Sequence, residues 1–132
     1  KIGSLASSKH KSGYSRIGIN KKSYLSHRLA WLYVYGEFPK VIDHINNDRS
    51  DNKILNLRQA TYQQNSWNQK ITSRNKSGIK GVSWNAKNLY FKLYLSINNK
   101  RIHIGYFDSL LDAKKIIIKS RSNYHKEFCN HG

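Results

Sequence analysis

The sequence predicts an α+β protein built from two small, unlike domains. Three observations support this prediction: segments of alternating apolar and polar residues occur in both halves, other segments have helical spacing, and a polar, basic run separates the halves. The chain has 132 residues, which is enough for one ordinary domain or two small ones. Because no internal repeat relates the halves, we expect each half to form a different domain.

The first half begins with a predicted hairpin and a helix. In "YSRIGINKKSYLS", residues 14–26, apolar and polar residues alternate on both sides of a turn at Asn20 and Lys21. The next run, "HRLAWLYVYGEFP", residues 27–39, has apolar residues at helical spacing, and Gly36 is the expected end of that helix.

The stretch "VIDHINNDRSDNKILNLRQATYQQN", residues 41–65, predicts a strand, a polar loop, a second strand and the start of a helix. The first strand is "VIDH", the second is near "RQAT", and the helix begins near Tyr62. In this arrangement His44 ends a strand and Asn65 lies on the first turn of the helix. We therefore expect the two side chains to meet around one small site.

The second half predicts three strands and one helix. "YFKLYLSI" and "RIHIGYF" alternate strictly around the turn "NNK", and "IKGVSW" supplies a third, shorter strand. Ser109 opens the helix, with Asp112 as its capping-box partner. The expected buried stripe of this helix consists of Leu110, Ala113, Ile117, Tyr124 and Phe128.

One face of the predicted sheet is left uncovered by the helix. It carries Lys92, Tyr94, Arg101 and His103. Such a face can be an ordinary solvated surface. In a chain this basic, a bare sheet face rich in cations and aromatic rings is also suited to read a nucleic-acid groove.

Charge indicates the partner. Lys and Arg number 24 against 7 acidic residues, a net charge of +17, and aromatic residues make up 12% of the chain. Residues 1–70 contain 12 basic and 4 acidic residues, and residues 71–132 contain 12 and 3. A charge this high usually means a polyanionic partner. Because there is no long apolar run and no basic helix with a wide apolar face, we expect nucleic acid and no membrane.

Cysteine content and chain composition limit the remaining classes. The single cysteine, Cys129, excludes disulfides within the chain and any zinc site made of several cysteines. The sequence shows no signal peptide or transmembrane segment, so a cytoplasmic location is expected. It contains no methionine, and we therefore expect the natural protein to begin before residue 1.

The residues around Asp43-His44 suit phosphodiester hydrolysis. A neutral His44 imidazole can take a proton from water beside a backbone phosphate. One divalent cation, Mg²⁺ or Mn²⁺, can be held by the Asp43 carboxylate and the Asn65 amide, with water and phosphate oxygens completing its coordination. Asn56 is a candidate to orient the imidazole. His27, at the start of the predicted helix, is expected to be structural rather than a ligand.

A simpler interpretation applies to parts of this stretch. An isolated Asp-His pair is a weak signal that often caps a turn. Asn46, Asn47 and Asn52 are most simply loop residues that form Asx turns, and Asp48 and Asp51 cap or screen local charge. Taken as a set, the residues favour an active site.

The run "HRLAWLYVYGEFPKVIDHINNDRSDNKILNLRQATYQQNSWNQ" resembles the HNH endonucleases of the phage and homing type. That family has a ββα-metal core and a pattern of Asp-His, then Asn 12 residues after the His, then Asn or His about 9 residues further. Here the pattern corresponds to Asp43-His44, Asn56 and Asn65. The resemblance implies that His44 is the general base, that Asp43 and Asn65 bind the metal, and that Asn56 orients the histidine or braces the loop.

The second half is similar to the APETALA/ethylene-response-factor DNA-binding domain. The similarity rests on "SGIKGVSWN" and "YFKLYLSINNKRIHIGYFDSLLDAKKI" and covers about residues 77–127. That family lays a three-stranded sheet into the major groove. The first strand here lacks the arginines of the plant pattern, so no base specificity is transferred. The DNA contacts that the resemblance implies are Lys80, Ser83, Trp84, Lys92, Tyr94, Arg101 and His103; for Trp84, a position in the core is an equal alternative.

We therefore expect a ββα-metal (HNH) nuclease domain at residues 1–70, a linker at 71–76, and at 77–132 a DNA-binding domain with a small three-stranded antiparallel sheet plus one helix. The expected function is a monomeric, Mg²⁺- or Mn²⁺-dependent DNA endonuclease without other cofactors. It acts on double-stranded DNA, as a homing endonuclease encoded by a phage or prophage in a bacterial host. The alternative is a catalytically inactive DNA-binding or regulatory protein. A structured-RNA binder is less favoured, because the HNH constellation would then have no purpose.

Overall fold

A three-stranded antiparallel sheet forms where the alternating residues predict a hairpin. In the computed structural model, which describes residues 7–132, its strands are β1 (Ser8–Lys9), β2 (Ser15–Ile19) and β3 (Lys22–Leu25). The turn residues Asn20 and Lys21 both have positive φ, 48° and 62°, which matches the twist of a tight two-residue hairpin. The hairpin is confirmed, and β1 is an additional strand that the sequence did not predict.

Helix α1 (Ser26–Tyr35) follows β3 and supplies the core of the first part of the chain. It ends at Gly36, whose φ of 74° lets its N–H donate to the carbonyl oxygen of Leu32. Trp31 of α1 is buried against Ile42 and Leu57, which lie on the next two strands. The helix therefore anchors the strand pair that carries the candidate site.

Strands β4 (Val41–His44) and β5 (Leu57–Ala60) pair in an antiparallel ladder, with His44 opposite Leu57. The 3₁₀ turn η1 (Ile54–Asn56) precedes β5, and helix α2 (Tyr62–Asn68) follows it. The strand–loop–strand–helix order predicted for residues 41–65 is confirmed. All four residues of β4 are buried, although β5 is its one neighbouring strand among the described residues.

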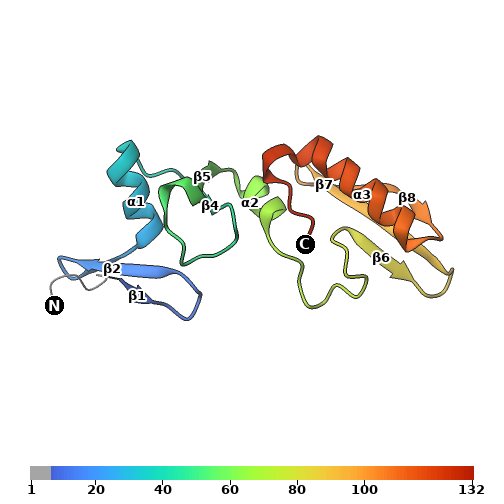
Figure 1. Ribbon diagram of the computed structural model, residues 1–132, viewed down its shortest axis with the longest axis horizontal. Helices are drawn as coiled ribbons and strands as arrows, with labels where there is room; N and C mark the ends of the chain where they lie inside the picture. The colour runs from blue at the N-terminus through green and yellow to red at the C-terminus, as the bar shows by residue number, and fades with distance from the viewer. Residues whose placement is uncertain (1–6) are drawn as a thin grey trace. The chain divides into compact units, whose positions relative to one another are not determined.

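The second sheet consists of β6 (Val82–Asn85), β7 (Tyr90–Ile97) and β8 (Lys100–Phe107), antiparallel and in that order. Helix α3 (Leu110–His125) runs along one face of it (Figure 1), and the turn η2 (Lys126–Phe128) follows. Leu93 of β7 and Ala113 and Ile117 of α3 are fully buried between sheet and helix. The predicted three strands and one helix, with Ser109 capping the helix, are confirmed.

The buried row of α3 differs from the expected stripe. Ala113, Ile117 and Phe128 are buried, as expected, but Leu110 and Tyr124 are 39% and 57% exposed. Arg121 and His125 are buried instead, at 2% and 5% exposure. The helix presents every fourth residue to the sheet, and that row includes a cation and an imidazole whose side chains bond to backbone carbonyls.

The chain divides into two compact units, one ending at Tyr62 and one comprising Gln63–Gly132. This division falls inside α2, whereas the sequence analysis placed the domain limit after Lys70. The reason lies in the contacts of α2. The ring of Trp67 stacks on His125 at 4.2 Å, and the carbonyl oxygen of Asn68 accepts from the side chain of Asn130. Most of α2 is therefore held by the second unit.

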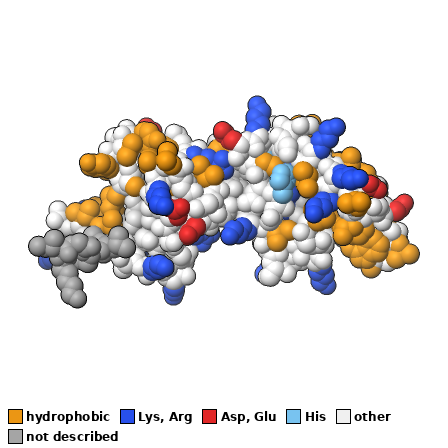
Figure 2. Space-filling view, in the orientation of Figure 1, with side chains coloured by type: hydrophobic (Ala, Val, Ile, Leu, Met, Phe, Trp, Pro, Cys, Tyr) orange, Lys and Arg blue, Asp and Glu red, His pale blue; other side chains and the backbone are white. Residues whose placement is uncertain are grey.

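The described surface is strongly basic. Figure 2 shows Lys and Arg side chains projecting at many places over both units on the face in view. Within the described residues, no helix combines the length and apolar composition needed to cross a membrane.

Candidate functional site

Strand β4 places Asp43 in an ion pair whose carboxylate is buried. Asp43 is 4% exposed and faces Arg58, its neighbour across the β4–β5 ladder. The Arg58 Nε and Nη2 atoms lie 2.9 Å and 2.8 Å from the same carboxylate oxygen, Oδ2. Two charge-assisted hydrogen bonds of this kind hold a carboxylate in one orientation. The sequence analysis did not foresee Arg58, because the pairing depends on the register of the two strands.

His44, the last residue of β4, contacts an asparagine of the loop. Its Nε2 atom lies 3.2 Å from Oδ1 of Asn52, and the amide nitrogen of Asn52 donates to the carbonyl oxygen of Ser50 at 3.1 Å. The second bond orients the amide so that its oxygen faces the ring. Because an amide oxygen can only accept, Nε2 carries the hydrogen, and Nδ1 is the nitrogen with a lone pair.

Asn56 braces the loop between the strands. Its Oδ1 atom accepts from the backbone N–H of Asn46, and its Nδ2 atom donates to Asn46 Oδ1 and to the carbonyl oxygen of Asp51. Its own carbonyl oxygen accepts from the N–H of Ile45 at 2.9 Å. Of the two roles that the resemblance implied for Asn56, these bonds correspond to bracing. Asn52, which the sequence analysis treated as a loop residue, makes the contact with the imidazole.

The rest of the loop is built from Asx turns. The side chain of Asn46 accepts from the N–H of Asp48, and the side chain of Asp48 accepts from both the N–H and the hydroxyl of Ser50. These bonds with Ser50 lower the pKa of Asp48. A loop tied in this way has few accessible conformations, so it can hold Asn52 against His44.

A cluster of rings surrounds His44. The His27 ring meets it edge to face, with centroids 5.0 Å apart, and Tyr14 lies 5.3 Å from His27 and 6.0 Å from His44. His27 is 5% exposed, and burial, with the nearby His44 and Arg28, lowers the pKa of its imidazole to about 4. Arg49 covers the other part of the cluster, with its guanidinium 4.9 Å from the Tyr14 centroid. His27, which was expected to be structural, therefore also contacts the candidate base, His44.

Asp43 and Asn65 each carry an oxygen donor of the kind that a hard cation prefers. Asp43 offers a carboxylate next to His44, and Asn65, on the first turn of α2, offers an amide oxygen. The joint ligation of one ion by Asp43 and Asn65 stays a prediction. No cluster of three or more His, Cys, Asp or Glu side chains with metal-site geometry occurs among the described residues.

The uncovered face of the second sheet presents the expected residues together. Tyr94 lies opposite His103, and the Arg101 guanidinium stacks on Tyr94 at 3.9 Å from the ring centroid. Lys92 approaches the rings of Tyr90 and Tyr106 at 5.7 Å and 6.0 Å. A β-bulge between Leu93 and Tyr94 shifts the register at this point. Tyr90 and Tyr106 were not among the predicted contacts; they extend the same face.

Three of the predicted DNA contacts lie outside the β7–β8 ladder. Ser83 pairs with Lys92 and shares its face. Trp84 pairs with Phe91, with ring centroids 4.6 Å apart, on the face that α3 covers, although it is 45% exposed. Lys80 precedes β6, and its ammonium donates to the carbonyl oxygens of Trp67 and Gln69. Trp84 and Lys80 therefore do not lie with the other five, because strand register and burial direct their side chains elsewhere.

One protein family and two known proteins are similar to this chain. Residues 24–67, which include β4, β5 and most of α2, match the HNH endonuclease family. Protein 3.8 of Escherichia phage T7 is 32% identical over 104 residues, which span 77% of this chain and 85% of that protein. An uncharacterized HNH endonuclease of Acanthamoeba polyphaga mimivirus is 40% identical over 77 residues, which span 57% of this chain and 41% of that protein. No solved structure matches.

Proposed function

Because the chain belongs to the same family as Protein 3.8 of phage T7 and carries an HNH endonuclease domain at residues 24–67, we propose that it is a metal-dependent endonuclease that hydrolyses phosphodiester bonds of double-stranded DNA. The observation that carries the proposal is the position of His44. The imidazole ends a buried strand, and Asn52 lies within hydrogen-bond distance of its Nε2, so we assign the role of base to Nδ1.

In this mechanism Nδ1 of His44 takes a proton from a water molecule, which attacks the phosphorus while the 3′ oxygen leaves. Asn52 keeps the hydrogen on Nε2 and fixes the plane of the ring. The hydrogen bonds of Asn56 hold the loop that carries Asn52. His27 packs against the ring, and its own low pKa keeps a second positive charge away from the imidazolium that forms.

Asp43 and Asn65 would hold the divalent ion, Mg²⁺ or Mn²⁺, in the ββα-metal arrangement. When bound, such an ion stabilises negative charge on the phosphate and on the leaving oxygen. The oxygen donors fit these two metals better than zinc, which prefers nitrogen and sulfur ligands. Arg58 keeps the Asp43 carboxylate at the end of β4 and leaves it little rotational freedom.

The sheet face supports a role in choosing the cutting site. Arg101, Tyr94, His103 and Lys92 form a contiguous surface of cations and aromatic rings. We propose that this face contacts DNA as the APETALA-type sheet does, and that the protein is a homing endonuclease of a phage or prophage. In that case the second unit directs cleavage and the site at His44 carries it out.

One observation favours a second candidate. Arg58 already occupies one oxygen of the Asp43 carboxylate, and a metal ligand usually has its charge available to the ion. A chain with a permanently paired Asp43 would be a DNA-binding or regulatory protein that retains the HNH fold without cleaving DNA.

The two candidates differ in a plasmid assay. Supercoiled plasmid is incubated with the protein and Mg²⁺, with a chelator control and with His44→Ala in parallel. The nuclease converts the plasmid only with the metal, and His44→Ala loses roughly 10² to 10⁴ in rate while DNA binding stays within a few-fold. Cleavage by His44→Ala at the wild-type rate would remove His44 from the mechanism. DNA binding without any metal-dependent cleavage by the wild type would establish the second candidate.

A further inference from the structure

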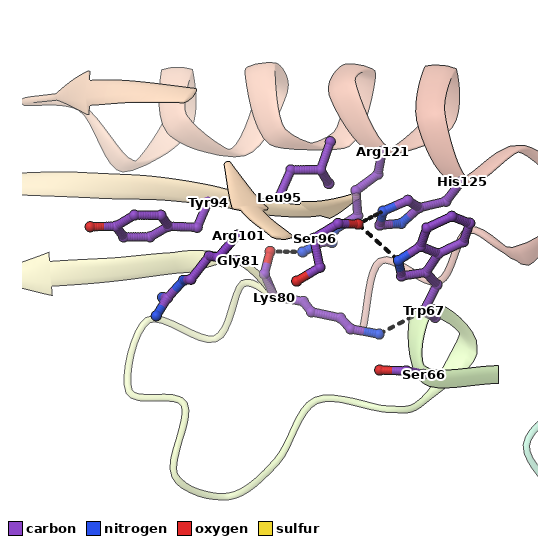
Figure 3. Close-up of a pocket in the computed structure, with 10 residues that line it drawn as sticks. All are labelled: Ser66, Trp67, Lys80, Gly81, Tyr94, Leu95, Ser96, Arg101, Arg121 and His125. Carbon is purple, nitrogen blue, oxygen red and sulfur yellow. Dashed lines mark hydrogen bonds between the residues drawn. The ribbon is translucent and has the colours of Figure 1, made fainter. Parts of the chain in front are cut away.

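A cavity of about 280 Å³ is lined entirely by residues of the second unit. It is open to solvent on one side and is bordered by α2, the segment before β6, the strands β7 and β8, and α3. Its lining includes Trp67, Lys80, Ser96, Arg101, Arg121 and His125. In Figure 3, Arg121 and His125 extend from α3 towards Ser96, and Lys80 runs along the other side towards Trp67. The cavity has room for several water molecules or for one small anion.

Arg121 is the most unusual group in this cavity. It is 2% exposed, and its Nη2 atom donates to the carbonyl oxygen of Lys80. Its Nη1 atom is buried and has no hydrogen-bond partner. No Asp or Glu is among the described residues that line the cavity. A buried guanidinium without a counter-ion is costly, and an anion bound beside it would remove much of that cost.

The backbone is shaped to admit this guanidinium. Gly81 has a φ of 80°, and a Cβ atom there would lie 2.5 Å from the carbonyl oxygen of Tyr94 and 2.9 Å from Nη2 of Arg121. Only glycine therefore allows Arg121 to approach the chain at this point.

The other polar groups add donors and positive charge. Lys80 uses two of its three N–H groups on the carbonyl oxygens of Trp67 and Gln69, and burial and the nearby Arg121 lower the pKa of its ammonium to about 8. His125 is 5% exposed. Its Nε2 atom bonds to the carbonyl oxygen of Ser96 at 3.1 Å, and its Nδ1 atom is buried without a partner.

The cavity also adjoins the basic sheet face. Arg101 lines the cavity and stacks on Tyr94, which lines it too. A phosphate group seated beside Arg121 would therefore belong to a strand of nucleic acid that continues over that face, or to a free phosphate.

We propose that this cavity is a phosphate-binding site, in which the guanidinium of Arg121, the remaining N–H of Lys80 and the guanidinium of Arg101 donate to one phosphate group. A guanidinium fork and an ammonium are the side-chain donors best suited to phosphate oxygens. The site uses no residue of the proposed catalytic centre, so it can be tested without any cleavage.

The first test uses the wild-type chain and inorganic phosphate. The indole N–H of Trp67 bonds to the Ser96 carbonyl at the wall of the cavity, so its ¹H–¹⁵N resonance reports on occupancy. Titration with sodium phosphate should shift this resonance saturably, whereas sodium chloride at equal ionic strength should not. The indole of Trp31, buried in the core of the first unit, is the internal control and should not move.

The second test distinguishes DNA phosphate from free phosphate, and this arm rests on the proposed function. Arg121→Met and Lys119→Met each remove one positive charge from α3, but Lys119 is exposed and does not line the cavity. If a backbone phosphate occupies the site, Arg121→Met should flatten the slope of log K against log salt for duplex DNA by about 0.9 more than Lys119→Met does. Lys80→Met, which removes another proposed donor of the cavity and lies outside the sheet face, serves as the second variant if Arg121→Met does not fold.

Each outcome decides the proposal. A phosphate-dependent shift of Trp67 together with the extra loss of slope assigns the site to DNA, and the shift with equal slopes assigns it to free phosphate. The extra loss of slope without the shift also supports a site for DNA phosphate. Neither effect, in a wild type and variants that are folded by circular dichroism, would overturn the proposal and leave Arg121 as a structural residue. Failure of plasmid cleavage would have no bearing on the phosphate titration.

Discussion

The contact between Asn52 and His44 makes a quantitative prediction about the proposed base. Replacing Asn52 by Leu removes the acceptor that lies 3.2 Å from Nε2 and keeps a side chain of similar size. The hydrogen on the imidazole can then move to Nδ1, and the ring can rotate. A neutral hydrogen bond contributes about 0.5 to 1.5 kcal/mol, and about 1.4 kcal/mol corresponds to a tenfold change in rate.

Cleavage by Asn52→Leu should therefore be slower by roughly 2- to 10-fold, far less than the loss expected for His44→Ala. Asn52→Asp keeps an acceptor at the same place and adds a negative charge, so it should retain cleavage and move the rising limb of the pH–rate profile to higher pH. The control is Leu55→Ala, because Leu55 lies in the neighbouring turn and is 91% exposed.

The assay is plasmid cleavage under single-turnover conditions, with the pH varied and with the thermal midpoint of each variant measured alongside. The reasoning is refuted if Asn52→Leu cleaves at the wild-type rate. It is also refuted if Asn52→Leu and Asn52→Asp lose equal activity in proportion to lost thermal stability, because Asn52 would then only support the loop.

Three further predictions follow from the two units. Asp43→Ala should abolish cleavage more completely than Asn65→Ala, because it removes the charged ligand, and it should lower stability by ~1 to 3 kcal/mol, because the partly buried Arg58 loses its acceptor. Plasmid assays and denaturant melts measure the two effects, and equal activity of the two variants would contradict the ligand assignment. The pKa of His27 is lowered to about 4, so the folded state binds its proton less readily than the unfolded state, and the stability from this group is complete above about pH 6.5. That stability declines by on the order of 3 kcal/mol as the pH falls towards 4. In urea melts, His27→Phe should lose this part of the pH dependence, whereas an unchanged dependence would point to other groups. Arg101→Glu should weaken duplex binding, flatten its salt dependence and alter the choice of cutting site. A fragment ending near Lys70 should show a larger loss of binding and of salt dependence and should cleave only weakly, because its last helix loses its packing partners. Identical salt slopes and site choice for the intact chain, the variant and the fragment would mean that the sheet face is an ordinary solvated surface.

Local patterns in the sequence determined where the elements begin and end. Asn20-Lys21 and Asn98-Asn99 adopt positive φ because a two-residue hairpin turn requires it. Gly36 ends α1 because the left-handed conformation of a helix C-cap favours glycine. These requirements concern neighbouring residues only, so alternation, helical spacing and turn residues were enough to predict them. The spacing of Asp43-His44, Asn56 and Asn65 likewise identified the stretch that matches the HNH endonuclease family.

The tertiary structure decided which side chains meet. Asn52, rather than Asn56, contacts His44, because a network of side-chain hydrogen bonds closes the loop between them. Arg58 reaches Asp43 because the two residues are opposite each other in the ladder. That register is set only when the two strands pair in the folded chain.

Burial was decided in the same way. The buried stripe expected from the sequence did not include Arg121 and His125, but the row of α3 that faces the sheet includes them, and backbone carbonyls from distant segments accept their hydrogen bonds. Sequence patterns specify backbone conformation over a few residues. Whether a polar side chain is buried depends on partners supplied by segments far along the chain, and only the folded chain brings those partners to it.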